Sequence, residues 1–143
     1  ARTPMPWNGS KNGGFTSGTP WIMLNPDYPE INVEKALADP DSVFYFYKKL
    51  IALRKDNPIM PYGEGELIWP EDKEIFAYYK HFEGEKWFIA ANFSEVEANR
   101  FLPMDLSKAE LILTNVPDSD WHSSERLILA PYQVVILRAS GKT

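Results

Sequence analysis

The sequence predicts a mainly β protein in which a long loop and a single long helix precede an antiparallel β-sandwich. Residues 39–57 have the hydrophobic period of a helix, with terminal residues that fit both of its ends. After Pro58 the pattern changes to short runs of β-branched and aromatic residues separated by turn signals. The expected strands are residues 66–69, 74–82, 86–93, 100–103, 110–114, 126–129 and 133–138.

The composition is that of an ordinary folded protein and excludes several classes of function. The 143 residues suffice for one domain with a real core. A net charge of −5 argues against a nucleic-acid partner, which needs a basic surface. No apolar run reaches the ~18 residues of a membrane span. Without cysteine the chain has neither disulfides nor thiolate metal sites, which fits a reducing compartment.

Residues 1–34 have the glycine and proline content of a loop, yet they carry many large apolar side chains. A free linker has few such residues, so this loop is expected to pack against another surface. Residues 30–38 are expected to hold a short helical turn that leads into the long helix. The large apolar residues are Met5, Trp7, Phe15, Trp21, Ile22, Met23, Leu24, Tyr28 and Ile31.

The long helix has a start signal and a stop signal. Asp39 is a suitable N-cap, because its carboxylate can accept from the free amides of the first turn. Pro40 suits the first helical position, and Arg54 and Lys55 add positive charge at the negative end of the dipole. Pro58 then ends the helix.

The apolar face of this helix is unusually wide. At 100° per residue its apolar side chains fill an arc of roughly 180°, which suggests burial against two surfaces. Arg54 falls near the middle of that arc. Either its stem packs while its head reaches water, or a buried guanidinium is held by a carboxylate or by backbone carbonyls. The arc contains Val43, Phe44, Phe46, Tyr47, Leu50, Ile51 and Leu53.

The predicted strands are apolar on both faces. In residues 86–93, Trp87 and Ile89 point one way while Phe88 and Ala90 point the other. Such strands lie between two layers, so they favour an antiparallel sandwich of about 80 residues.

Spacing alone identifies no catalytic, metal-binding or cofactor-binding residue. His81 and His122 are far apart in sequence, and Asp118-Ser119-Asp120 lacks the rest of a calcium loop. Carboxylates are plentiful, but no two can be assigned as the acid and nucleophile of a glycosidase. The sequence therefore predicts no catalytic residue, no metal and no cofactor within this chain.

One long stretch resembles a known family. It is similar to the segment after the eighth barrel strand in the α-amylase superfamily, closest to oligo-1,6-glucosidases, dextran glucosidases, α-glucosidases and trehalose-6-phosphate hydrolases. The resemblance is strong over residues 1–65 and looser through the sandwich. The matching motifs are Arg2-Thr3-Pro4-Met5-Pro6-Trp7-Asn8, Ser10-Lys11-Asn12-Gly13-Gly14-Phe15, Thr19-Pro20-Trp21-Ile22, Asn25-Pro26-Asp27-Tyr28, Ile31-Asn32-Val33-Glu34, Asp39-Pro40-Asp41-Ser42 and Tyr47-Lys48-Lys49-Leu50-Ile51-Ala52-Leu53-Arg54-Lys55.

The resemblance implies two parts. Residues 1–57 would be the loop after the last strand of a (β/α)8 barrel plus its last helix, and residues 58–143 the C-terminal β-sandwich. In the family the catalytic carboxylates precede this segment, so none is carried onto this chain. Arg2 matches a residue at the mouth of the substrate pocket and is expected to lie on the substrate side. The family usually has glutamine at Pro6, aspartate at Asn8 and alanine at Gly13.

The expected function follows from this resemblance. The chain is expected to be the C-terminal part of a cytoplasmic bacterial α-glucosidase acting on short α-1,6-linked oligosaccharides, inactive by itself. Its expected partners are the barrel of the same polypeptide and the oligosaccharide. Without the barrel, Trp7, Phe15, Trp21 and part of the helix should lie near water, and two copies are expected to associate. The alternative is a stand-alone carbohydrate-binding module using Trp69, Trp87 and Trp121.

Overall fold

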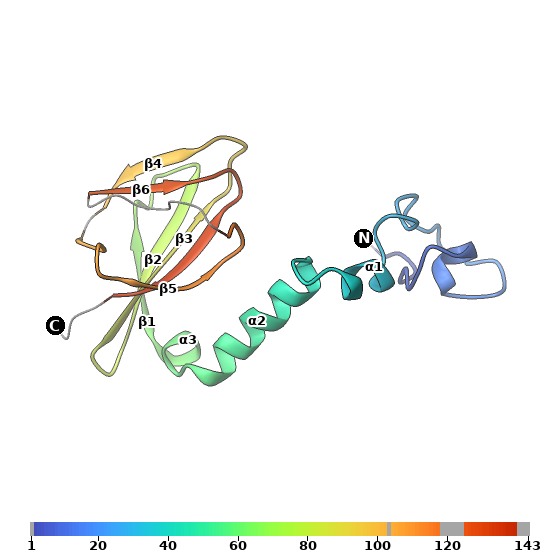
Figure 1. Ribbon diagram of the computed structural model, residues 1–143, viewed down its shortest axis with the longest axis horizontal. Helices are drawn as coiled ribbons and strands as arrows, with labels where there is room; N and C mark the ends of the chain where they lie inside the picture. The colour runs from blue at the N-terminus through green and yellow to red at the C-terminus, as the bar shows by residue number, and fades with distance from the viewer. Residues whose placement is uncertain (1, 103, 118–124, 140–143) are drawn as a thin grey trace. The chain divides into compact units, whose positions relative to one another are not determined.

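The computed structural model describes residues 2–102, 104–117 and 125–139 (Figure 1). The chain divides into two compact units, residues 1–52 and residues 53–143, and each is described by itself. The predicted division after residue 57 concerns the domains of the resembled family and stays a prediction. No helix among the described residues is long and apolar enough to cross a membrane.

The first unit contains the 3-10 turn η1 (Lys11–Gly14), the short helix α1 (Val33–Ala38) and the start of the long helix α2 (Val43–Asp56). The predicted short helical turn is confirmed by α1, and the predicted stop before Pro58 is confirmed by the end of α2. The predicted N-cap is wrong. Asp39 ends α1, its carboxylate accepts from the Asp41 amide at 2.9 Å, and the first helical bond of α2 runs from Phe46 to Ser42.

The second unit begins with the short helix α3 (Ile59–Tyr62), which the sequence did not predict, and its described residues continue with seven strands. All seven predicted strands are confirmed, with ends that differ by no more than two residues. They are β1 (Glu64–Ile68), β2 (Ile75–Phe82), β3 (Glu85–Asn92), β4 (Ala98–Phe101), β5 (Glu110–Thr114), β6 (Arg126–Leu129) and β7 (Val134–Arg138).

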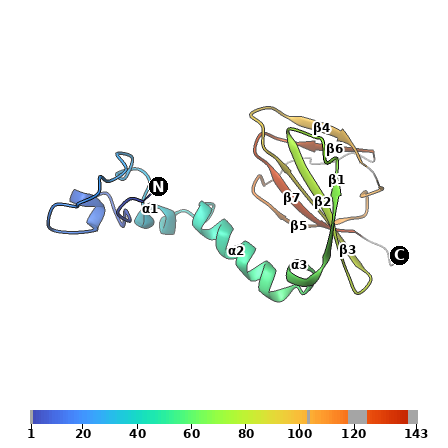
Figure 2. The same cartoon turned by 180° about the vertical axis from the view of Figure 1, so that it is seen from behind.

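The strands form two sheets of unequal size. The larger sheet has the order β1-β2-β3-β7-β5 and the smaller pairs β4 with β6; every neighbouring pair is antiparallel. The smaller sheet lies over the larger one, and from behind β1 is seen at the open edge (Figures 1 and 2). The predicted antiparallel sandwich is therefore confirmed.

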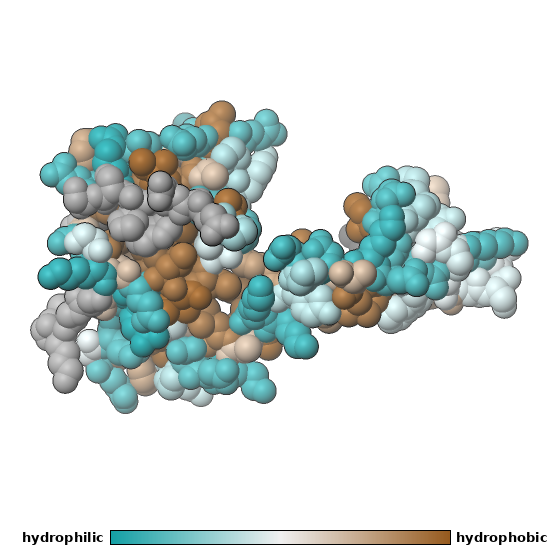
Figure 3. Space-filling view, in the orientation of Figure 1, coloured by the Kyte–Doolittle hydropathy of each residue, from teal (hydrophilic) through white to brown (hydrophobic). Residues whose placement is uncertain are grey.

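The core lies between the two sheets, where hydrophobic side chains gather with hydrophilic ones above and below (Figure 3). Phe88 and Ala90 of β3 face this core, as the alternation predicted. Trp87 and Ile89 on the opposite face are also buried. On the same face as Trp87, Lys80 of β2 donates to the carbonyls of Met60 and Gly63 at 2.6 and 3.1 Å, which fixes the end of α3 on the sheet. The core residues are Ile68, Ile75, Ala77, Tyr79, Phe88, Ala90, Ala98, Leu106, Leu127, Leu129, Val135 and Leu137.

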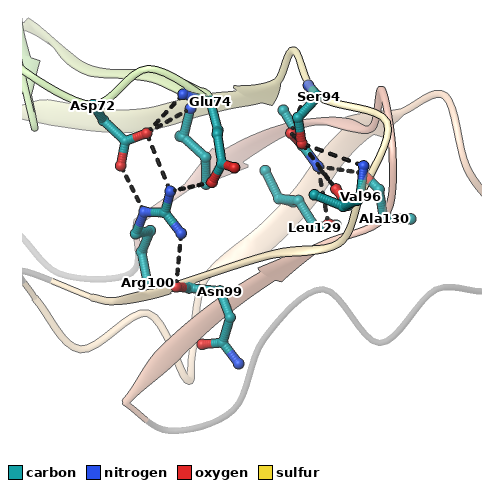
Figure 4. A network of polar contacts seen from close by, with 10 residues as sticks. Asp72, Glu74, Ser94, Val96, Asn99, Arg100, Leu129 and Ala130 are labelled. Carbon is teal, nitrogen blue, oxygen red and sulfur yellow. Dashed lines mark hydrogen bonds and ion pairs between the residues drawn. The ribbon is translucent and has the colours of Figure 1, made fainter.

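Two polar clusters join the layers (Figure 4). Arg100 of β4 donates to the Asp72 carboxylate at 2.5 and 3.2 Å and to the Glu74 carboxylate at 2.6 Å. The buried Asn92 at the end of β3 donates to the carbonyls of Val96 and Ala130 at 2.8 and 3.0 Å. These bonds fix the strand ends where the chain passes between the sheets.

Candidate functional site

The candidate site is the loop that begins at Arg2. Arg2 is exposed, and the Pro4 side chain two residues later is buried. From Pro6 onward the loop closes on itself: the amides of Trp7 and Asn8 both donate to the Gly13 carbonyl, at 2.7 and 3.2 Å. The exposed guanidinium of Arg2 thus projects from a segment whose following backbone is fixed.

The far end of this loop is bonded to its beginning through the start of α1, which Asn32 caps. The Asn32 side chain caps α1 by accepting from the Lys35 amide at 3.0 Å, and it donates to the carbonyls of Tyr28 and Pro29 at 2.9 and 3.3 Å. The first amides of α1, from Val33 and Glu34, donate to the carbonyls of Pro6 and Trp7 at 3.0 Å each. Residues 6–7 and 32–34 therefore form one fixed base, with the loop extending between them.

Two of the departures from the family pattern are neighbours in space. Gly13 has a φ of +64°, and a Cβ added there would lie 3.2 Å from the Pro6 Cα and 3.0 Å from a methyl of Leu24. Alanine at position 13 would be strained by both the left-handed backbone and the close contacts. Proline at position 6 and glycine at position 13 therefore fit one local loop shape.

The third departure, Asn8, also has a local role. Its side-chain oxygen accepts from the Ser10 amide at 3.0 Å and from the Ser10 hydroxyl at 2.6 Å. A carboxylate oxygen could accept the same bonds, so the turn tolerates either residue. The Asn8 side chain lies against Gly14, where an added Cβ would come within 2.7 Å of its amide nitrogen.

The aromatic residues of the loop are exposed, as the sequence predicted. Trp7, Phe15 and Trp21 are 50%, 47% and 90% exposed. The apolar stripe of α2 is also exposed at Val43, Phe44, Tyr47 and Ile51, which with Lys48 line a hollow of about 470 Å³. The first unit therefore presents much apolar surface to solvent.

The prediction that Arg54 is buried and paired is wrong for this chain. Arg54 is exposed. The reason is that α2 has no buried residue, so no covering surface forces the guanidinium to find a partner.

The described carboxyl groups with a clearly shifted pKa are unsuited to act as a general acid. Glycosidase chemistry needs one carboxyl with a raised pKa. The hydrogen bond from Arg100 holds the pKa of Asp72 far below its usual value, and the bonds to Ser107 lower that of Asp105. Across residues 2–102, 104–117 and 125–139, no group of three metal-ligating side chains comes together.

The remaining candidates from the sequence do not form a site. His81 contacts the Glu66 carboxylate at 3.3 Å on the surface of the larger sheet. His122, Trp121 and residues 118–120 lie outside the described residues. Trp87 is 1% exposed and so presents no free face for a sugar ring, whereas Trp69 is half-buried against the core. The alternative of a carbohydrate-binding module therefore loses Trp87 as a binding residue.

Sequence reasoning missed Asn32 and the pairing of Pro6 with Gly13. Asn32 had a visible signal, since asparagine is a strong N-cap and stands directly before α1. The pairing of Pro6 with Gly13 had none, because it depends on the folded loop.

Comparisons with known proteins agree with the fold. Residues 1–63 match the family model of the α-amylase catalytic domain. The chain is 43% identical to an oligo-1,6-glucosidase of Bacillus cereus and 44% identical to a trehalose-6-phosphate hydrolase of Bacillus subtilis, each over 96% of this chain and 25% of the relative. A trehalose-6-phosphate hydrolase structure from Bacillus licheniformis superposes with a TM-score of 0.89 at 40% identity, covering 97% of this chain and 26% of that one.

The same architecture also occurs in a synthase, in addition to the hydrolases above. An isomaltulose synthase structure from Klebsiella superposes with a TM-score of 0.86 at 33% identity, over 95% of this chain and 24% of that one. Together with the match of residues 1–63 to the catalytic-domain model, these similarities place the chain in the α-amylase superfamily. Within the superfamily the chain is similar to oligo-1,6-glucosidases and trehalose-6-phosphate hydrolases. The chain spans about a quarter of the length of these relatives.

Proposed function

We propose that the chain acts as the C-terminal part of an α-glucosidase that hydrolyses short α-1,6-linked isomalto-oligosaccharides. The observation that carries this proposal is the similarity over nearly the whole chain, at 43% and 44% identity, to two oligo-1,6-glucosidases. Residues 1–57 would supply the last loop and helix of the catalytic barrel, and the sandwich would support that barrel. The absence of cysteine fits a cytoplasmic location.

In this proposal the catalytic carboxylates belong to the barrel, and Arg2 lies at the mouth of its substrate pocket. An exposed guanidinium offers five donors to sugar hydroxyls. The fixed backbone from Pro6 onward supports such a role, since it begins only four residues after Arg2. The chain alone would bind no substrate productively, because hydrolysis needs an acid and a nucleophile across a cleft.

Release of nitrophenol from nitrophenyl α-glucoside tests this function. We expect turnover by the full-length gene product that contains this chain and none by the 143-residue chain alone. Isomaltose, maltose and trehalose-6-phosphate then serve as competing substrates, with isomaltose expected to have the highest kcat/KM. Preferred hydrolysis of trehalose-6-phosphate would overturn the substrate assignment. Turnover by the purified chain alone would overturn the proposal that the catalytic carboxylates belong to the barrel.

A further inference from the structure

Two asparagine–glycine pairs lie in the candidate loop, Asn8-Gly9 and Asn12-Gly13, and they are the only such pairs in the sequence. An asparagine followed by glycine is prone to deamidation, because glycine has no side chain to hinder its own amide nitrogen. In this reaction that nitrogen attacks the side-chain carbonyl carbon of the asparagine. The structure places the two pairs in opposite hydrogen-bond environments.

The side-chain amide of Asn8 is arranged for attack on its carbonyl carbon. The amide and the hydroxyl of Ser10 both donate to the Asn8 Oδ1, at 3.0 and 2.6 Å. Negative charge develops on this oxygen during the attack, so the two donors stabilise the transition state. The Asn8 Nδ2, which leaves as ammonia, makes no hydrogen bond within the described part of the chain.

The attacking nitrogen of Gly9 is free as well. Gly9 is exposed, and its amide makes no hydrogen bond to any residue that the structure describes. The bond from the Ser10 amide to the Asn8 Oδ1 closes a ring that contains both the Gly9 nitrogen and the Asn8 carbonyl carbon. The two reacting atoms therefore belong to one closed turn, which favours their reaction.

Asn12 and Gly13 differ in each of these respects. The Gly13 amide donates to the Ser10 carbonyl at 2.8 Å, and Gly13 is buried, so its nitrogen is not free to attack. The Asn12 Nδ2 donates to the carbonyls of Thr16 and Gly18 at 3.1 and 2.7 Å, which holds the group that would have to leave. No described residue donates to the Asn12 Oδ1.

We propose that Asn8 is a self-deamidation site of the folded protein and that Asn12 is protected from the same reaction. The Gly9 nitrogen bonds to the Asn8 Cγ and gives its proton to water. The Cγ–Nδ2 bond then breaks, and the nitrogen leaves as ammonia with a proton taken from water. Water opens the resulting succinimide, which yields aspartate by attack at Cγ or isoaspartate by attack at the backbone carbonyl.

The two products affect the loop differently. Aspartate at position 8 keeps an oxygen that accepts from Ser10, so the turn is preserved. Isoaspartate adds one atom to the main chain before Gly9, which disturbs the bonds from the Trp7 and Asn8 amides to the Gly13 carbonyl. The isoaspartate form should therefore be cut sooner by protease in this loop than the aspartate form.

Incubation of the full-length gene product at mildly alkaline pH, followed by peptide mass spectrometry, tests the proposal. In the folded protein we expect deamidation at Asn8 to be about tenfold faster than at Asn12. In guanidinium chloride both pairs lose their hydrogen bonds, so the two rates should become similar. A folded-state ratio no larger than the ratio in denaturant would overturn the proposal, as would a folded protein that keeps the Asn8 amide intact.

Substitutions of Ser10 test the role of its donors. Ser10→Ala removes the hydroxyl that bonds to Oδ1 and should slow the reaction at Asn8 about fivefold. Ser10→Thr keeps a hydroxyl and should restore the rate. Ser17→Ala is the matched control, because Ser17 is an exposed serine of the same loop that makes no hydrogen bond among the described residues. An unchanged rate in Ser10→Ala, or an equal loss in Ser17→Ala, would overturn the role of the turn.

Gly9→Ala tests the attacking nitrogen. A Cβ at this position would lie 3.5 Å from the Pro29 carbonyl oxygen, which is an ordinary contact, so the loop should keep its shape. The added methyl hinders the nitrogen, and deamidation at Asn8 should fall about tenfold. A variant that deamidates as fast as wild type would show that the Gly9 nitrogen is not the nucleophile and would overturn the proposal.

Discussion

Among single residues, the charged groups between the two sheets have the clearest physical consequence. The Asp72 and Arg100 side chains are 11% and 28% exposed, so water screens their contact only partly. The hydrogen bond from Arg100 is the main cause of the lowered pKa of Asp72, with help from the amides of Glu74 and Ile75 and against the effect of burial. A lowered folded-state pKa stabilises the fold above the unfolded pKa and loses that effect as the pH falls.

Asp72→Asn should therefore destabilise the sandwich by about 2 kcal/mol at pH 7, since it leaves the Arg100 guanidinium without its main partner. Urea unfolding at pH 7 and pH 3 measures the effect, and the difference from wild type should shrink at pH 3. Glu30→Gln removes the exposed partner of Lys35 and is the control, with little expected change. A loss that is equal at both pH values would contradict the ionic origin.

A second prediction concerns the buried indole of Trp87. Its Nε1–H is buried and has no acceptor among the described residues. Trp87→Phe removes the unpaired donor while keeping most of the ring, so the free energy of unfolding should stay within about 1 kcal/mol of wild type. Trp87→Ala should cost about 3–5 kcal/mol. A loss of 3 kcal/mol in the phenylalanine variant would show that the indole has a partner.

Among the elements, α1 matters because it closes the candidate loop. It is only six residues long, and its first amides are bonded to Pro6 and Trp7. A helix this short is not stable by itself, so its end depends on the Asn32 cap. The conformation of the loop and the presence of α1 are therefore expected to be lost together.

Asn32→Ala should destabilise both the loop conformation and α1. We expect a loss of about 1–2 kcal/mol from the missing cap, with faster hydrogen exchange at the amides of Val33 and Glu34. Limited proteolysis should cut the loop sooner than in wild type. Asn25→Ala removes only the bond to the Asp27 amide in an exposed turn and provides the comparison. Unchanged exchange at Val33 and Glu34 would show that the loop base does not need Asn32.

The elements also show what sequence can and cannot predict here. All seven strands were predictable, because alternation and turn residues are local signals. The start of α2 was not, since Asp39 is used to accept from the Asp41 amide and to end α1. The Asp72–Arg100 pair and the position of β7 between β3 and β5 depend on distant contacts that no local pattern records. Arg2 as a substrate-side residue comes from resemblance alone and stays a prediction.

On the scale of the whole molecule, many large apolar side chains are exposed to solvent. Exposed examples occur in the loop, along α2 and on the strands, including Trp21 at 90% and Val43 at 78%. Soluble monomers rarely keep large apolar patches open. The 143-residue chain by itself should therefore self-associate, because association would bury these apolar side chains.

We expect the isolated chain to form twofold dimers, the commonest closed assembly. Light scattering after gel filtration measures the mass, and Trp21→Ser combined with Tyr47→Ser should shift the chain toward monomer. Phe101→Ser alters an exposed residue of the sandwich and is the control. A wild-type monomer at high micromolar concentration, with the loop protected from protease, would contradict the prediction.

The place of β7 affects how the protein can be made in a cell. This strand, Val134–Arg138, is hydrogen-bonded between β3 and β5, so the last of the described strands to be synthesised occupies the interior of the larger sheet. Domains fold as units during synthesis, and here the sheet cannot close until residue 138 has left the ribosome. A premature stop before residue 134 would remove a central strand instead of trimming an edge. Such shortened chains should therefore stay unfolded and be degraded by proteases.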